Sequence, residues 1–159
     1  MIANIENLVK QMSHGVYVIG VTDGLQQNAF TAAWVMQASF KPPLLALSIN
    51  PEHFSYKLLH AGRVCSINVL AQHQYAIAEH FGHSAKDKMA GFQWQADITG
   101  APILSEALAY FDCRVSHYTD AGDHIIALCQ VVSAGILNQG KPLLYNQTGN
   151  MDGSSELYK

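Results

Sequence analysis

Charged side chains are scarce in this sequence. Only 13% of its 159 residues are Asp, Glu, Lys or Arg, whereas an average globular domain has about 25%. Nine Lys and Arg against twelve Asp and Glu give a net charge of −3, which excludes the basic surface needed to bind nucleic acid or an anionic membrane. Because 49% of the residues are apolar, so small a domain has too little charge to cover itself. We therefore expect a second copy of the chain or a large ligand to cover part of its surface.

Long hydrophobic runs and a cysteine framework are also absent. The longest apolar run, 15–21, has the length of a strand and is well below the roughly 18 to 20 residues that cross a bilayer. The first residues include Glu6 and lack a signal-peptide cleavage pattern. Cys65, Cys113 and Cys129 are widely spaced and form no CxxC motif, so we expect buried, reduced thiols and a cytoplasmic protein.

Several motifs for catalysis and metal binding are missing. There is no GxGxxG motif and no P-loop, which removes the usual signatures of a Rossmann or NTPase site. Gly82 opens a segment like the nucleophile turn of esterases, but Lys86 stands where the second glycine belongs. His80 and His83 could share a helix face, yet no carboxylate completes a metal-binding set. We expect no bound metal.

The remaining pattern predicts a mainly β domain. Runs rich in β-branched and aromatic residues predict strands at 16–22, 28–38, 44–49, 63–70, 110–118 and 124–137. Helical spacing of apolar residues predicts short helices over the first dozen residues, 55–62 and 74–82. Closely spaced strands without βαβ alternation favour a closed or nearly closed antiparallel barrel. We expect one domain over 1–145, followed by a polar tail at 146–159 that frays.

Alternation within two of these strands predicts which side chains face the barrel interior. The strand 63–70 is expected to be half-buried, with Cys65, Ile67 and Val69 on its inner face. In the strand 110–118 the same alternation places three apolar residues inward and three polar residues outward, the latter being Asp112, Arg114 and Ser116.

Three clusters could hold a flat ligand that carries a phosphate. The small residues at 31–33 would let a planar ring lie against the strand backbone. Ser55 lies near the first turn of a predicted helix, where free amides favour a phosphate. The loop 81–88 adds hydroxyl and ammonium groups, from Ser84, Lys86 and Lys88. Each cluster also has an ordinary interpretation, as a tightly packed strand, a helix cap or a solvated loop. Together they predict one convergent pocket.

Four blocks occur in a specific order along the chain: NAFTAAWVMQASFKPPLLALSINPEHFSYKLLHAGRVCSINVL, HFGHSAKDK, GAPIL and AGDHIIALCQVVSAG. Together they resemble the flavin reductase domain family, whose fold is the FMN-binding split barrel. The resemblance covers about residues 10–145. It implies a six-stranded antiparallel Greek-key barrel with short flanking helices, a homodimer with flavin at the subunit interface, and NAD(P)H as the reductant.

The resemblance also implies roles for individual residues. The strand that holds the flavin ring in the family corresponds to Thr31, Ala32, Ala33 and Trp34. The segment that contacts the ribityl chain corresponds to Ser48, Ile49 and Asn50, and the phosphate-binding turn to Ser55 and Tyr56. The loop that closes over the site corresponds to Phe81, Gly82, Ser84 and Lys88. Gly122-Asp123-His124 resembles the family's Gly-Asp-His signature, so His124 is expected on the nicotinamide side of the flavin as the catalytic residue. His53 stands where the family commonly has a firmer cation, which keeps FAD as an alternative to FMN.

The implied activity is that of an NAD(P)H:flavin oxidoreductase that passes reduced flavin or electrons to a partner monooxygenase or another acceptor. Hydride transfer between two cofactors needs no acid, base or nucleophile from the protein, which agrees with the missing catalytic triad. Two alternatives stay open. The chain would be a non-catalytic flavin-binding electron carrier if the indole of Trp34 occupied the place of the nicotinamide. A pyridoxamine-phosphate-oxidase-like flavoenzyme would share the barrel.

Overall fold

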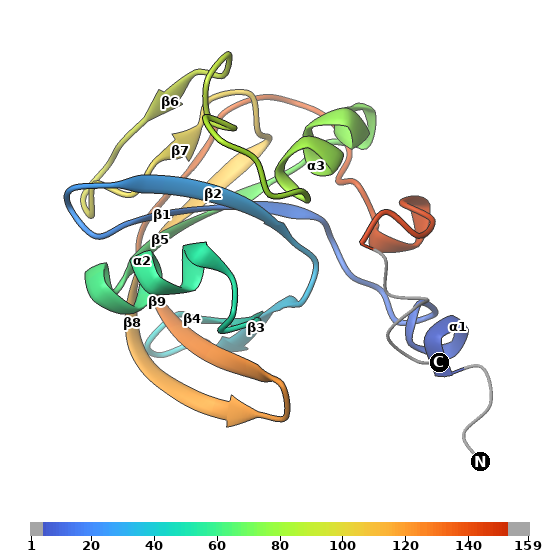
Figure 1. Cartoon of the computed structure of the whole chain (residues 1–159), viewed down its shortest axis with the longest axis horizontal. Helices are drawn as coiled ribbons and strands as arrows, with labels where there is room; N and C mark the ends of the chain where they lie inside the picture. The colour runs from blue at the N-terminus through green and yellow to red at the C-terminus, as the bar shows by residue number, and fades with distance from the viewer. Residues whose placement is uncertain (1–4, 153–159) are drawn as a thin grey trace.

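A seven-stranded antiparallel sheet forms most of the molecule (Figure 1). The computed structural model of the chain describes residues 5–152. The strand order is β2-β1-β5-β8-β9-β4-β3, and every neighbouring pair is antiparallel. In chain order, these strands are β1 (Tyr17–Thr22), β2 (Gln27–Ala32), β3 (Val35–Ser39), β4 (Leu44–Ile49), β5 (Val64–Val69), β8 (Ala109–Ala121) and β9 (His124–Ile136).

The two edge strands of this sheet are joined by the chain itself. β2 and β3 stand at opposite edges of the strand order, yet only two residues, Ala33 and Trp34, separate them along the chain. The stretch 27–39 is therefore one bent strand, whose first half (β2) pairs with β1 and whose second half (β3) pairs with β4. Counted as one strand, it closes the sheet into a six-stranded barrel. Closure of this kind removes exposed sheet edges. The prediction of a mainly β split barrel is confirmed.

Short helices and a small ribbon flank the barrel. They are α1 (Ile5–Val9), α2 (Phe54–Gly62), the 3₁₀ turn η1 (Gln72–Gln74), α3 (Tyr75–Phe81), the two-stranded ribbon of β6 (Trp94–Gln95) and β7 (Ile103–Leu104), and the 3₁₀ turn η2 (Tyr145–Gln147). The first helix ends at Val9, before the predicted end near residue 12, and residues 1–4 of the prediction lie outside the described residues. Within residues 5–152, no helix is long and apolar enough to span a membrane.

The barrel interior is a closely packed apolar core. Ile19, Leu47 and Ile67 are fully buried there, together with all three cysteines, which are free thiols as predicted. The Sγ atoms of Cys65 and Cys129 lie 3.8 Å apart. Hydrogen bonds to the other two thiols, then burial, raise the pKa of Cys65 well above its usual value.

Two expectations about polar residues on the barrel wall are wrong. β5 is buried on both faces rather than one, because the 97–104 segment covers its outer side. The amide of Asn68 donates to Val18 O at 2.9 Å and accepts from Leu104 N at 3.1 Å. Asp112, predicted to face solvent, is fully buried and accepts a hydrogen bond from Thr99 N at 2.9 Å.

The first part of the expected polar tail packs against the domain. Tyr145 and Thr148 are buried, and Lys10 Nζ donates to Gly149 O at 2.7 Å. This segment lies beside α1 (Figure 1). Residues 146–152 therefore contact the domain, while 153–159 lie outside the described residues.

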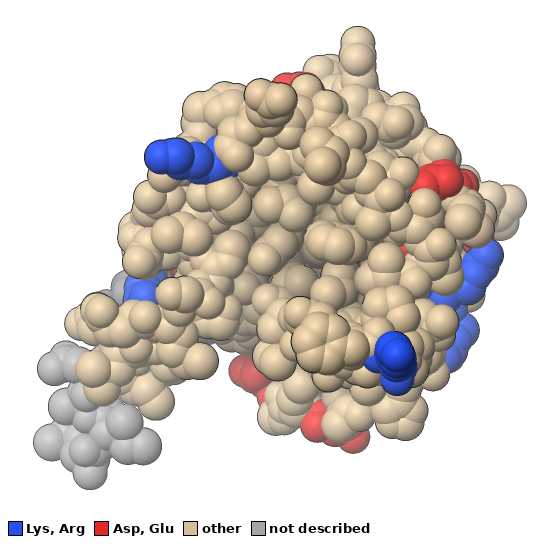
Figure 2. Space-filling view, turned by 180° about the vertical axis from the view of Figure 1, so that it is seen from behind, with Lys and Arg blue, Asp and Glu red and all other residues tan. Residues whose placement is uncertain are grey.

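The molecular surface reflects the scarcity of charge in the sequence. On the face shown in Figure 2, Lys, Arg, Asp and Glu lie mostly toward the margins, and other residues form most of the central area. Several large apolar side chains are exposed on the described surface, among them Met36 at 65% and Phe40 at 84%.

Candidate functional site

A pocket of about 240 Å³ opens where six separate segments meet. These segments are the residue before β1, the bend between β2 and β3, the end of β4 with the turn after it, the residue after α3, the tip of the β8–β9 hairpin and the segment that contains η2. The pocket combines residues from distant parts of the chain, as expected of a binding site built on a barrel. Nine predicted site residues line it: Thr31, Ala32, Ala33, Trp34, Ser48, Ile49, Asn50, Gly82 and His124.

The bend between β2 and β3 exposes backbone to this pocket. The ladder with β1 ends at Ala32, and the ladder with β4 begins at Val35. Ala33 and Trp34 therefore lie outside both ladders, although Ser48 N donates to Trp34 O at 3.0 Å. The small side chain at Ala33 leaves this backbone open to a planar group. Thr31 has a structural role as well, because its hydroxyl donates to Ala78 O at 2.6 Å and ties β2 to α3.

The tip of the β8–β9 hairpin brings an imidazole against the indole of the bend. The rings of Trp34 and His124 have centroids 4.8 Å apart and are tilted by 47°. His124 Nδ1 lies 2.7 Å from Asp123 Oδ1, and this contact is the first cause of the lowered pKa of Asp123. An ionised carboxylate only accepts, so Nδ1 carries the proton and Nε2 remains for other contacts.

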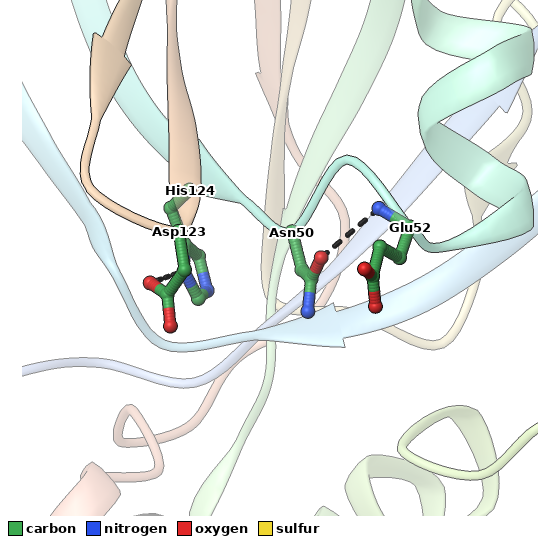
Figure 3. Close-up of polar contacts among 4 residues, drawn as sticks. All are labelled: Asn50, Glu52, Asp123 and His124. Carbon is green, nitrogen blue, oxygen red and sulfur yellow. Dashed lines mark hydrogen bonds and ion pairs between the residues drawn. The ribbon is translucent and has the colours of Figure 1, made fainter.

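Asn50 stands across from this hairpin tip. Its side-chain oxygen accepts from Glu52 N at 2.9 Å, which leaves the amide NH₂ group free of that contact. In Figure 3 the side chains of Asn50 and His124 come from different elements and point toward the same side. The side-chain amide of Asn50 and the imidazole of His124 thus point to the same side of the site.

His53 and Lys88 supply basic groups to this side of the molecule. His53 lines the pocket, and its pKa is lowered first by burial and then by the charges of Lys88 and His124. Lys88 itself is 9% exposed, and burial lowers its pKa. Among residues 5–152, no salt bridge neutralises Lys88. A part-buried ammonium without a counter-ion favours an anionic ligand beside it.

Other predicted site residues do not line the pocket. Ser55 is buried behind it and accepts a hydrogen bond from Asn28 Nδ2 at 2.9 Å. The ring of Tyr56 turns toward Tyr118, with centroids 6.3 Å apart. Neither side chain of this first turn of α2 lines the pocket.

The predicted closing loop is only partly at the pocket. Gly82 lines it, whereas Phe81 is a core residue under the β6–β7 ribbon and Ser84 is exposed to solvent. Lys88 does not line the pocket, but its charge is one cause of the lowered pKa of His53. The helical periodicity of α3 places the apolar Phe81 inward, so the loop reaches the pocket only with residues after Phe81.

Several lining residues have no signal in the sequence. Val16, Phe30, Tyr145, Met151 and Asp152 complete the wall, and the hydroxyl of Tyr145 hydrogen-bonds to the carboxylate of Asp152. Two of these five, Met151 and Asp152, belong to the segment whose polar composition predicts a frayed tail. A bridge between Gly15 and Leu144 holds the chain just before that segment against the barrel, and no local pattern announces such a long-range contact.

Comparison with known proteins gives consistent matches. The flavin reductase like domain family matches residues 9–154. The FMN reductase (NADH) RutF of Agrobacterium fabrum is 34% identical over 142 residues, which are 87% of this chain and 81% of that protein. Diflavin flavoprotein A 1 of Synechocystis is 31% identical over 138 residues, 84% of this chain, but the chain spans only 24% of its length.

A solved structure extends the similarity to three dimensions. BorF, the flavin reductase component of a bacterial two-component tryptophan halogenase, superposes with a TM-score of 0.82 at 25% identity, covering 91% of this chain and 92% of BorF. The family match contains all the strands of the barrel and the segment from Tyr145 to Asp152, which lines part of the pocket. The chain belongs to the flavin reductase like domain family.

Proposed function

We propose that this chain is an NAD(P)H:flavin oxidoreductase that binds FMN in the pocket at the β2–β3 bend, with FAD as the alternative flavin. The pocket at this bend, lined by both His124 and His53, with the charge of Lys88 acting on His53, is the observation that carries the proposal. The names of its relatives, an NADH-dependent FMN reductase and a flavin reductase component, support it.

The residues present fit such a cofactor. The open backbone at Ala33 suits the polar edge of a flat ring, and its amide can hydrogen-bond that edge. The free amide of Asn50 is available to the ring or the ribityl chain. Lys88 supplies a charge without a counter-ion in the described chain, as a phosphate would require.

Bound flavin would supply the hydride-accepting chemistry, with the nicotinamide as donor. The protein's own part is positioning. The bend holds one edge of the pocket, and Trp34 and His124 form a wall that would orient the donor and exclude water. Asp123 fixes the tautomer and direction of the imidazole of His124.

Replacing Lys88 tests the phosphate end of the site. We expect Lys88→Ala to weaken FMN about tenfold, because a charge-assisted hydrogen bond is worth roughly 1.5 to 3 kcal/mol, and to leave riboflavin binding nearly unchanged. Fluorescence titration of both ligands measures this. Lys86→Ala, at an exposed lysine of the same loop, is the matched control and should bind both ligands normally. Equal losses for FMN and riboflavin in Lys88→Ala would contradict the assignment.

A homodimer is part of the proposal. Trp34, Met36 and Phe40 project an apolar surface along and just beyond β3 that is 40%, 65% and 84% exposed, respectively. Trp34 also lines the pocket, so a second copy seated on this surface would border the flavin. Burying such a surface stabilises association.

Sedimentation analysis tests this arrangement. The unaltered chain is expected to sediment as a dimer, and Met36→Lys to shift it toward the monomer and to weaken FMN binding. Leu25 is 95% exposed at the β1–β2 turn, away from β3, so Leu25→Lys should leave the dimer intact. A monomer that binds FMN fully would exclude the shared site.

A non-catalytic flavin carrier is the second candidate, and the position of Trp34 favours it. The indole is 40% exposed and packs on His124, so it stands beside the place a donor would take. Rapid mixing of FMN-loaded protein with NADH separates the two functions. A reductase bleaches the flavin absorbance, whereas a carrier keeps it.

The electron acceptor and the compartment complete the proposal. We expect a monooxygenase or another two-component partner to receive reduced flavin, because related reductases carry such names. The cytoplasm remains the expected location, and three free thiols suit its reducing conditions.

A further inference from the structure

The turn before α2 carries a basic ring that no structural contact requires. His53 is the N-cap residue of α2, but its side chain makes no capping hydrogen bond. Its backbone serves the turn instead, since its carbonyl accepts Tyr56 N–H at 3.0 Å and its N–H donates to Asn50 O at 3.1 Å. The imidazole lines the pocket and is free to respond to a ligand that binds there.

Two cationic groups act on His53, whereas the carboxylate of Asp152, which lines the same pocket, accepts a hydrogen bond from the hydroxyl of Tyr145. Lys88 approaches from the loop after α3, and His124 from the start of β9. Partial burial of the imidazole is the first cause of the lowered pKa of His53, and the charges of Lys88 and His124 add to it, although the residue as a whole is exposed. Glu52, its neighbour along the chain, is exposed and does not line the pocket. His53 is therefore mainly neutral in the free protein at neutral pH.

We propose that His53 takes up a proton from solvent when the phosphate monoester of FMN binds, so that this residue couples the affinity for phosphorylated flavin to pH. The inference rests on the proposed flavin-binding function. The negative charge of a phosphate dianion beside His53 and Lys88 opposes the positive charges around the imidazole and favours its charged form. The ring then changes from a neutral hydrogen-bond partner to a charge-assisted donor, which is roughly twice as strong.

The direction of the pH effect follows from proton linkage. The complex holds more protons than the free protein, so FMN affinity falls as pH rises through the interval between the two pKa values of His53. The phosphate itself titrates near pH 6, so the measurement is made from about pH 7 upward, where the phosphate is already a dianion. Riboflavin has no phosphate, so its affinity should stay constant there.

Calorimetric titration of the full chain in buffers of different ionisation enthalpy measures the proton uptake. The unaltered protein is expected to take up protons with FMN but not with riboflavin. His53→Gln keeps a hydrogen-bonding side chain without the titrating ring. It should bind FMN about tenfold more weakly near pH 7, show no uptake, and bind riboflavin normally. His73→Gln, at an exposed histidine of η1, is the control and should match the unaltered protein.

Two results would overturn the inference. Unaltered protein that binds FMN without proton uptake would show that His53 does not titrate, while leaving the flavin site itself intact. Equal uptake in His53→Gln would assign the proton to another group, Lys88 included. Failure of both FMN and riboflavin to bind would instead remove the proposed function and this inference with it.

Discussion

Leucine in place of Ala33 is expected to lower FMN affinity by up to about a hundredfold. Ala33 lies between the ladders of β2 and β3 and lines the pocket, so a larger side chain would fill the space against the open backbone. Overpacking of a formed site costs typically 1 to 3 kcal/mol, and about 2.7 kcal/mol corresponds to a hundredfold change. Fluorescence titration with FMN and with riboflavin measures the loss, which should be equal for the two.

The matched control is Ala61→Leu. Ala61 is an exposed residue of α2 that does not line the pocket, and this variant should bind FMN normally. Thermal unfolding of both variants shows whether the barrel persists. A folded Ala33→Leu protein with unchanged FMN affinity would place the flavin ring elsewhere.

Alanine in place of His124 is expected to slow NADH-dependent flavin reduction about a hundredfold, which is the cost of a misplaced donor, with FMN affinity nearly unchanged. His124 supports the indole of Trp34 at a ring distance of 4.8 Å and is itself held by Asp123. Without the imidazole, the donor loses a contact and the indole loses its support. Rapid-mixing measurement of flavin bleaching at saturating NADH gives the rate.

A second histidine of the same hairpin provides the control. His117 is exposed on β8 and lies outside the pocket, so His117→Ala should retain the full rate. An unchanged rate in His124→Ala would show that the hairpin tip has no part in hydride transfer. A lost rate accompanied by lost FMN would assign His124 to flavin binding instead.

Local sequence patterns predict most of the barrel. Apolar runs, several of them rich in β-branched or aromatic residues, mark the main strands, and Gly122, with φ of 64°, gives the β8–β9 hairpin its tight turn. The predictions fail where distant segments cover a surface. Alternation predicts that Asp112 faces solvent, but the 97–104 segment covers this residue, and the backbone N–H of Thr99 donates a hydrogen bond to its carboxylate. Alternation reports the face of a strand and not the segments that pack on that face.

For the same reason, the sequence predicts some residues of the candidate site and not others. The small residues of the β2–β3 bend and the hairpin signature at His124 are visible in the sequence, and the structure brings them to one pocket. Ser55 carries a hydroxyl at the start of a helix, but the geometry of the first turn gives that hydroxyl to Asn28. The wall from Tyr145 to Asp152 depends on long-range packing, for which composition gives no signal.

Equilibrium titration of the purified chain with FMN, followed by flavin absorbance and fluorescence, tests the flavin site most directly. We predict saturable uptake at about one FMN per chain, as a single formed pocket requires, with loss of that uptake in Ala33→Leu. A folded chain that takes up no FMN and no FAD would contradict the account.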